Sequence, residues 1–276
     1  YKLNLSSRFI KKLKYNNRIL CNSSPVHVNY IVKDGDIIDV LIDLQEEETD
    51  IVPEDLPISI IFEDDALIAM NKKPGIVVHP TSGHRSGTIA NALAYHFKNR
   101  GEKRKIRPVS RLDKDTTGII IFAKNQFVQE QLIQQMSLKT FTKEYIGIVS
   151  GIVTNKTGTI DLPIDRKPGS IMERHISSTG QRAVTHYEVV EYLNDATCLR
   201  FFLETGRTHQ IRVHCQAVGH PLVGDTLYSD RPSDLIDRQA LHSSCVSFVH
   251  PVTKTGIQLS APLPQDMKDL MEILRK

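Results

Sequence analysis

The side chains best suited to chemistry lie in a short polar turn ahead of an apolar segment. The turn carries Arg111, Asp113, Lys114 and Asp115, and residues 118–123 after it are apolar and β-branched, which is typical of a buried strand. Charges this close to a core strand cost desolvation energy unless they are paired or used. Arg111 and Asp113 are two residues apart, so an extended chain would place both on one face, as in an active site. The stretch alone is equally compatible with a solvated turn capped by its glycine.

The length of the chain, 276 residues, allows one large domain and a small accessory domain. Of its 276 residues, 40% are hydrophobic and 24% are charged, which is ordinary for a globular protein. The net charge of +3 is mild but unevenly distributed. Residues 45–57 carry six acidic residues and no basic one, whereas residues 98–107 carry six basic residues and one acidic. The basic loop is either an RNA contact or an ordinary solvated surface.

Several functional classes lack their sequence signals. The four cysteines are scattered without a C-x-x-C pair, which argues against structural zinc and favours a reducing compartment. Phosphate-cradling glycine patterns, G-x-S-x-G and H-E-x-x-H are all absent. No apolar run reaches the roughly 18 residues of a membrane span, and the first residues are not a secretory signal. We therefore expect a soluble cytoplasmic protein without a metal or cofactor, and without a membrane or obligate protein partner, that works as a monomer.

Residues 1–44 are predicted to form a small basic module. A helix with a serine cap signal spans residues 5–14 and is basic on its polar side, and short strand patterns follow at 18–20, 26–28 and 37–42. The pattern from Ser6 through Val28-Asn29-Tyr30 to Gly35-Asp36 resembles the alpha-L RNA-binding module of a small-subunit ribosomal protein. The opening R-L-D segment of that module is absent, so its first helix is expected to be missing or to lie outside the given sequence.

The resemblance to the RNA-binding module implies that the basic side chains of the first helix contact RNA. The residues concerned are Arg8, Lys11 and Lys12. A solvated helix face is the commoner explanation for a charge run of this kind. Residues 45–57, which are acidic and contain two prolines, are predicted to be a linker kept away from RNA by its charge.

Residues 58–276 are predicted to form the main domain. Strand patterns outnumber helical ones and often follow one another directly, as in the hairpin-like pair 58–62 and 66–71. Helical periodicity occurs at 88–98, 126–138 and 266–274, and a further helix reaches residue 217. Residues 151–181 are rich in turn signals and are expected to be irregular. The fold class expected is therefore α+β, with a mixed, largely antiparallel central sheet and flanking helices.

Four separated motifs of the main domain resemble those of the RluA/RluD-type RNA pseudouridine synthases and occur in the same order. They are Lys73-Pro74-Gly75-Ile76-Val77-Val78-His79-Pro80, Arg111-Leu112-Asp113-Lys114-Asp115-Thr116-Thr117-Gly118, Lys143-Glu144-Tyr145, and Thr205-Gly206-Arg207-Thr208-His209-Gln210-Ile211-Arg212-Val213-His214. Gly219-His220-Pro221-Leu222-Val223-Gly224-Asp225 and Leu241-His242 fit the family as well. The chain departs from the family pattern at Ser110, where histidine is frequent, and at Thr117, where serine is. Neither departure removes a group that the chemistry needs.

The resemblance implies a pseudouridine synthase fold and an isomerase that converts uridine in RNA to its C-glycoside without a cofactor. It implies that Asp113 is the essential carboxylate, that Arg212 pairs with it, and that Tyr145 stacks on the target base. Arg111 would fill the space left by a flipped uridine, and Leu241 would form a pocket wall. Arg207 and His209 would contact the substrate, although both residues are equally suited to shaping the turn before the helix.

The sequence leaves open the RNA substrate and two alternative functions. Large-subunit ribosomal RNA is the first expected substrate because of the added basic module, and transfer RNA is the second. A catalytically inactive RNA-binding or RNA-remodelling protein of the same fold is an alternative, against which the intact Asp113, Tyr145 and Arg212 argue. A glycoside hydrolase would need two carboxylates, and Asp115 is the close partner that the sequence offers.

Overall fold

The computed structural model describes residues 5–27, 29–42, 51–81, 83–230 and 233–276. Five helices lie in this part of the chain: α1 (Ser7–Tyr15), α2 (Ile89–Asn99), α3 (Gln126–Ser137), α4 (Gln210–Ala217) and α5 (Gln265–Leu274). The N-terminal strands are β1 (Ile19–Cys21), β2 (Ser24–Pro25) and β3 (Ile38–Val40). The main domain contains β4 (Ile60–Glu63), β5 (Leu67–Lys72), β6 (Arg107–Pro108), β7 (Thr117–Ala123), β8 (Thr142–Ser150), β9 (Thr157–Asp161), β10 (Ile164–Arg166), β11 (Arg174–Ile176), β12 (Val184–Tyr192), β13 (Ala196–Leu203), β14 (Leu241–Val249) and β15 (Gly256–Ser260).

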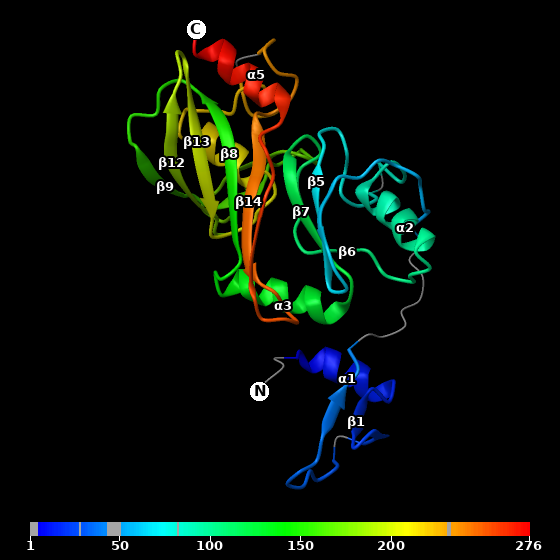
Figure 1. Ribbon diagram of the computed structural model, residues 1–276. Helices are drawn as coiled ribbons and strands as arrows, with labels where there is room; N and C mark the ends of the chain where they lie inside the picture. The colour runs from blue at the N-terminus through cyan, green and yellow to red at the C-terminus, as the bar shows by residue number, and fades with distance from the viewer. Residues whose placement is uncertain (1–4, 28, 43–50, 82, 231–232) are drawn as a thin grey trace.

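A ten-stranded sheet forms the centre of the main domain (Figure 1). Its strands lie in the order β4-β5-β7-β14-β8-β13-β12-β9, with β15 paired to β14 and β6 paired to β7. The β7–β14 pair is parallel, and the other pairs in this sheet are antiparallel. Together with the flanking helices, this arrangement confirms the predicted α+β class.

The β7–β14 pairing joins two parts of the sheet through few residues. His242 lies opposite Thr117, and Ser243 lies opposite Gly118. Gly118 has a φ of +103°, and a Cβ atom at this position would lie 2.1 Å from the main-chain oxygen of Ser243. Only glycine therefore allows the polar turn to enter β7 at this close approach.

Buried apolar side chains cover both faces of the sheet. β7 is buried along its whole length, with Ile120 and Phe122 in one cluster and Ile119 and Ile121 in another. This alternation is the period of two expected of a strand, and two-sided burial explains its continuous apolar sequence. The strand is thus a firm support for the polar turn that precedes it.

The N-terminal helix packs against the main domain near α3 (Figure 1). Phe9 and Leu13 of α1 are fully buried in the same apolar cluster as Phe127 and Leu132 of α3. Ser6 caps α1, as its sequence predicted, by accepting a hydrogen bond from the main-chain nitrogen of Phe9. The two N-terminal elements of the chain, helix and sheet, are therefore held beside α3.

Two local predictions were wrong. The second N-terminal strand lies at β2, not at residues 26–27, because the turn at Asn22 and Ser23 pairs β1 with the residues that immediately follow it. Residue 28 lies outside the described residues. Residues 151–181 contain β9, β10 and β11, which are short, and β9 is held by pairing with the distant β12. Long-range pairing of this kind is not visible in local turn signals.

The acidic segment predicted to be a linker lies partly outside the described residues, at 45–50. Its described part contacts the start of α2. The Asn91 side chain donates to the main-chain oxygen of Val52 (2.8 Å), and Glu54 accepts a hydrogen bond from the main-chain nitrogen of Gly87 (3.0 Å). Residues 51–54 are therefore attached to the main domain.

Candidate active site

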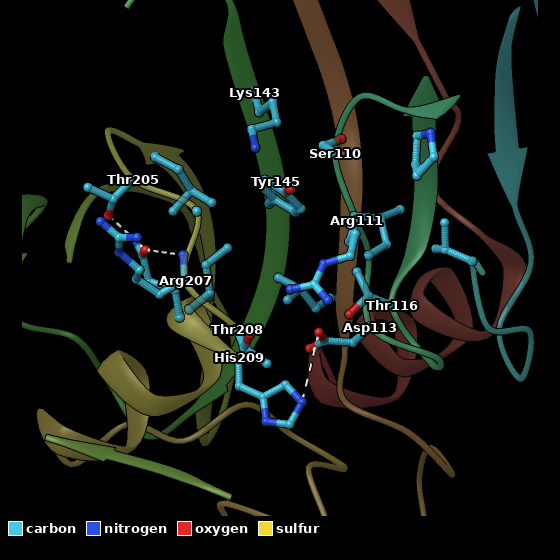
Figure 2. A pocket seen from close by; sticks show the side chains of 18 of the residues that line it. Ser110, Arg111, Asp113, Thr116, Lys143, Tyr145, Thr205, Arg207, Thr208 and His209 are labelled. Atoms are coloured by element: carbon cyan, nitrogen blue, oxygen red, sulfur yellow. Dashed lines mark hydrogen bonds and ion pairs between the residues drawn. The ribbon is translucent and has the colours of Figure 1, made fainter. Parts of the chain in front are cut away.

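A pocket of about 620 Å³ opens between the polar turn, the start of β8 and the loop that leads into α4. Side chains predicted from the sequence as site residues line it from different parts of the chain: Arg111, Asp113, Tyr145, Arg207, His209, Arg212 and Leu241. Figure 2 shows Asp113 and His209 facing one another across this pocket, with Arg111 and Tyr145 beside them. The volume is in the range of sites for small molecules or single residues of a polymer.

The turn that carries Asp113 is fixed by a buried lysine. Lys72 at the end of β5 donates hydrogen bonds to the main-chain oxygens of Lys73 (2.9 Å), Ile76 (3.0 Å) and Lys114 (2.5 Å). Asp115 adds a second link by accepting a hydrogen bond from the main-chain nitrogen of Gly75 (3.1 Å). The polar turn and the turn after β5 therefore hold each other in place, and the Asp115 carboxylate is used in this link.

Arg212 reaches Asp113 and is itself held by a buried carboxylate. Its Nη1 lies 3.3 Å from Oδ2 of Asp113, while its Nε and Nη2 each lie 2.8 Å from an oxygen of Asp225. The Asp225 side chain is fully buried, whereas that of Asp113 is 24% exposed. The planar guanidinium is thus aimed by a two-pronged ion pair, and its remaining nitrogen is directed at the more open carboxylate.

His209 approaches Asp113 from the other side. Its Nε2 lies 3.9 Å from Oδ1 of Asp113, and its Nδ1 lies 2.8 Å from the Tyr228 hydroxyl. His209 precedes α4 in a left-handed conformation with φ of 57°. Burial lowers the pKa of His209, and the charge of Asp113 opposes this effect. The ring is therefore fixed beside the carboxylate, and its position follows from the turn into α4.

Tyr145 and Leu241 provide the apolar side of the pocket. Both are buried, at 5% and 4% exposure, and they lie on the neighbouring strands β8 and β14. Burial, with a smaller effect from the nearby Asp113, raises the pKa of the Tyr145 phenol above its ordinary value. The tyrosine is therefore neutral at physiological pH, and an aromatic face is available to a planar group.

The two remaining predicted pocket arginines lie at the pocket surface. The side chain of Arg111 is exposed and extends over the pocket in Figure 2. Arg207 is also exposed, and its Nε donates to the main-chain oxygen of Arg182 (3.0 Å). These two cations are placed where an incoming polyanion would meet them first.

Three basic residues predicted on the first helix are outside the pocket. Arg8, Lys11 and Lys12 lie on α1, and none is among the described residues that line the cavity. Nζ of Lys12 lies 3.4 Å from Oε1 of Gln126 at the start of α3. Their surface is therefore separate from the pocket but attached to the same domain.

The basic loop 98–107 is partly neutralised by ion pairs of its own. Arg104 and Arg100 bind Glu102 at 2.6 and 3.1 Å, and Arg100 also lies 3.6 Å from Glu63. Lys98, which the structure places in the last turn of α2, is exposed. The loop is thus more ordered and less cationic than its composition indicates.

Sequence reasoning missed the roles of three residues at the site. Asp225 lies in a motif that resembles the family, but no local feature shows that it binds Arg212. Tyr228 orients His209 and also lies under the Arg212 guanidinium, whose central carbon is 5.0 Å from the ring centroid. The role of Lys72 was not predicted, because a lysine at the end of an apolar strand is usually solvated.

Two histidines of the quoted motifs, His79 and His242, lie in different surroundings. His79 lines the pocket. His242 is fully buried, with Nδ1 2.8 Å from the Thr117 hydroxyl and Nε2 3.2 Å from the main-chain oxygen of Ala261. Thr117 therefore supplies a hydroxyl at the position where the family often has serine.

Within the described ranges, no cluster of three His, Cys, Asp or Glu side chains is arranged to hold a metal ion. No helix among the described residues is long and apolar enough to cross a bilayer.

Comparison with known proteins identifies relatives over nearly the whole chain. The family model described as RNA pseudouridylate synthase matches residues 66–217. An uncharacterized RNA pseudouridine synthase of Bacillus subtilis, YhcT, is 43% identical over 271 residues, which cover 97% of this chain and 89% of the relative. The ribosomal large subunit pseudouridine synthase D of Escherichia coli strain K12 is 40% identical over 243 residues, which cover 83% of this chain and 74% of the relative.

Solved structures show the same fold. The human protein named RNA pseudouridylate synthase domain containing 4 superimposes with a TM-score of 0.64 and 24% sequence identity. The match covers 79% of this chain and 93% of the human one.

Proposed function

Because the chain belongs to the RNA pseudouridylate synthase family, we propose that it isomerises specific uridines of large-subunit ribosomal RNA to pseudouridine, with Asp113 as its essential carboxylate. The enzyme class follows from the family, whereas the RNA and the roles of individual residues are proposed. Relatives that are 40% identical carry the name ribosomal large subunit pseudouridine synthase D, which favours this RNA. Such a substrate would place the enzyme in the cytoplasm.

One observation carries the assignment of Asp113. Its carboxylate is partly exposed in the pocket and lies 3.3 Å from an arginine that Asp225 holds in a fixed orientation. A nearby fixed cation stabilises the negative charge of a carboxylate and holds it in one position, as a nucleophile or a general base requires. Asp115, the other acidic residue of the turn, is used in binding Gly75 and is absent from the pocket lining given by the described residues. A pair of flanking carboxylates, as in glycoside hydrolases, is therefore not supported at this turn.

The isomerisation needs a rotation of the base within a closed space. The bond from the ribose to N1 of uracil breaks, a new bond forms to C5, and a proton leaves C5 while N1 gains one. Asp113 would either attack the substrate or remove the sugar proton, and Arg212 would hold the carboxylate in position through a charge-assisted hydrogen bond. Tyr145 would stack on the uracil, and Leu241 would form the wall that limits its movement. All these steps use groups that the pocket already holds.

A uridine in structured RNA must leave its stack to reach Asp113. Extruding a base costs a few kcal/mol, part of which can be recovered when a side chain fills the gap. Arg111 is exposed and lines the pocket. We therefore assign it to the space left by the flipped uridine, with Arg207 and His209 next to the bound nucleotide.

The basic surface of α1 would add affinity for RNA outside the pocket. Arg8 and Lys11 are exposed on this helix, which packs beside α3 of the catalytic domain. Cations that neutralise RNA phosphates contribute a salt-dependent, sequence-independent part of the binding free energy. Residues 1–44 are accordingly proposed as an RNA-binding module, and residues 58–276 as the catalytic domain.

The assignment of Asp113 is tested by tritium release from RNA labelled at C5 of uridine. Wild-type protein should release tritium, and Asp113→Asn should lower the rate by at least about 10³-fold, because removal of a catalytic carboxylate costs this much in comparable sites. Asp115→Asn is the matched control and should retain activity above that of the Asp113 variant. Release by Asp113→Asn at the wild-type rate would disprove the assignment.

The choice of RNA needs a separate measurement. Pseudouridine should be mapped in total RNA from cells with and without the protein. Loss of a site from large-subunit ribosomal RNA is expected. Loss from transfer RNA alone would replace the proposed substrate, and RNA binding without loss of any site would favour an inactive RNA-binding protein.

A further inference from the structure

Lys143 is a cationic residue that lines the pocket and has no role in the reaction proposed above. It lies on β8, and its side chain extends into the pocket on the same face as Tyr145, as Figure 2 shows. Side chains two residues apart on a strand are about 7 Å apart along its axis. The Lys143 amine is thus next to the aromatic ring proposed to hold the uracil, displaced along the strand toward its beginning.

The amine has no anionic partner in the part of the chain that the structure describes. Among the described residues, no carboxylate lies within 4 Å of its Nζ and no acceptor forms a hydrogen bond with it. Arg212 differs, because two carboxylates surround it. Glu204, another pocket residue, is itself bound to Lys139 (2.7 Å) and to His186 (3.0 Å).

Lys143 is half-buried, and partial burial without a partner makes its ammonium group costly. Desolvation lowers the pKa of Lys143, and no nearby charge opposes the shift. Proteins seldom keep an unpaired charge in a partly dry place unless a ligand supplies the missing partner. The folded protein therefore holds this cation ready for a negative group that arrives with the substrate.

The chain also leaves one side of the amine uncovered. Gly206 in the loop before α4 is exposed, and a Cβ atom placed there would lie 3.8 Å from Nζ of Lys143. A larger side chain at this position would extend from the loop beside the amine. With glycine, a polymer backbone can approach Lys143 at the loop that carries Arg207 and His209.

We infer that Lys143 binds a phosphate of the RNA backbone adjacent to the flipped uridine. The inference rests on the proposed function, since it places the nucleotide in this pocket. A phosphodiester carries a permanent negative charge and so can neutralise the amine from the moment of binding. Uracil, in contrast, is neutral until its bond to ribose breaks. Lys143 is accordingly a substrate-binding residue that supplies affinity and positions the nucleotide between Tyr145 and Asp113.

The test measures RNA binding and chemistry separately in Lys143→Met. The binding probe is a fluorescein-labelled RNA stem-loop with one unpaired uridine in its loop, titrated by fluorescence anisotropy at several salt concentrations. We expect about 10-fold weaker binding, and a slope of log K against log salt that is reduced by about 0.7–0.9, the value for one phosphate contact. At saturating RNA, the single-turnover rate of tritium release should fall by a smaller factor than the affinity does, because the phosphate contact is made on binding.

Two control variants separate the local charge from other effects. Lys143→Arg keeps the charge and should retain most of the affinity. Lys268→Met removes the same charge from an exposed position of α5 and should leave the affinity of the stem-loop within twofold. Thermal unfolding of Lys143→Met should occur at the wild-type temperature or higher, because a half-buried charge without a partner among the described residues has been removed.

Neutral phosphate analogues identify the contact. The phosphates flanking the loop uridine are replaced one at a time by methylphosphonate. One replacement should weaken binding of the wild-type protein about 10-fold and have little further effect on Lys143→Met, because both changes remove the same interaction.

Three results would overturn the inference. They are an unchanged salt slope in Lys143→Met, additive losses from the variant and every methylphosphonate, and a lower single-turnover rate at unchanged affinity. The last would assign Lys143 to the uracil. Tritium release by the wild-type protein is measured on the same RNA, so failure of the proposed function would appear as absent release, independently of the binding results.

Discussion

Asp225→Asn is expected to damage both stability and catalysis, although Asp225 itself does not face the substrate. The carboxylate accepts two hydrogen bonds from Arg212 at 2.8 Å each and two more from the main-chain nitrogens of Leu227 (3.1 Å) and Tyr228 (3.2 Å). Asparagine retains one acceptor oxygen, but its amide group would direct N–H toward a nitrogen of Arg212. The variant therefore leaves a buried guanidinium facing a donor.

The size of the stability loss follows from the burial of the pair. Breaking a buried ion pair by removing one partner costs about 3–5 kcal/mol. In a chain somewhat smaller than this one, 1 kcal/mol corresponds to about 2–4 °C in Tm, so a decrease of about 6–20 °C is expected. Glu191→Gln is a matched control, since Glu191 also binds an arginine through two oxygens, at 2.7 and 2.8 Å from Arg275, but is 34% exposed. Exposed pairs contribute about 0–1 kcal/mol, so its Tm should change little.

The catalytic loss follows from the position of Arg212. Its Nη1 is held 3.3 Å from Asp113 by a guanidinium that Asp225 fixes, and a displacement of about 1 Å at a catalytic group can cost about 100-fold in rate. We expect a decrease of this order in the single-turnover rate of Asp225→Asn, measured by tritium release at a temperature where the variant is folded by circular dichroism. RNA affinity should fall much less. A rate within twofold of wild type in the folded variant would refute the argument that Asp225 positions Arg212.

Three further predictions concern the supports of the site and the module beside it. Burial lowers the pKa of Lys72 to about 8 from 10.5, so turnover should fall above about pH 8 as the amine loses a donor, and this fall should be absent from Lys72→Met. Between about pH 8 and pH 10.5 the Lys72 amine binds more protons in the unfolded chain than in the folded one, so its contribution to the unfolding free energy should rise with pH in this window. Chemical denaturation at a series of pH values would show a fall instead if folding stabilised the amine as a cation. Gly118→Ala should lower the unfolding free energy by about 2–5 kcal/mol, because the added Cβ would collide with β14. In the control Gly35→Ala, nothing lies within 4 Å of the added Cβ, so the positive φ alone should lower the unfolding free energy by about 1–2 kcal/mol. Equal losses in the two variants would disprove the role of the collision. Replacing Arg8 and Lys11 together with glutamine should reduce the salt slope of RNA binding by about 1.4–1.8, without changing the tritium-release rate at saturating RNA, and an unchanged slope would exclude α1 from the RNA contact.

Local patterns in the sequence were sufficient for most of the secondary structure. The apolar run 118–123 lies within β7, and the periodic stretches at 88–98, 126–138 and 266–274 correspond to α2, α3 and α5. These elements are long and strongly patterned, so side-chain periodicity decides them. The short strand β9 depends on its pairing with β12, which lies beyond the turn-rich segment, and could not be predicted in this way.

The sequence by itself determined which chemical groups the protein carries and which family they resemble. The order and spacing of the motifs around Asp113, Tyr145 and Arg212 are properties of the chain, and they are present before any folding. They indicated a carboxylate, an aromatic ring and a cation, together with a polar turn that ends in a glycine ahead of a predicted strand.

Only the tertiary structure decided which residues hold these groups, beyond the pairing of Arg212 with Asp113 that the family resemblance implied. Asp225 takes two nitrogens of Arg212 and leaves one for Asp113, and Lys72 bridges two turns through main-chain oxygens. Lys143 has no carboxylate partner among the residues that the structure describes. Ion pairing depends on distances of a few ångströms and on burial, and both are set by the way that β5, β7, β8 and α4 meet in the folded sheet. For this reason the different surroundings of Arg212, Asp113 and Lys143 arise only in the folded protein. Arg212 is held by Asp225, Asp113 is partly exposed, and Lys143 has no carboxylate partner among the described residues.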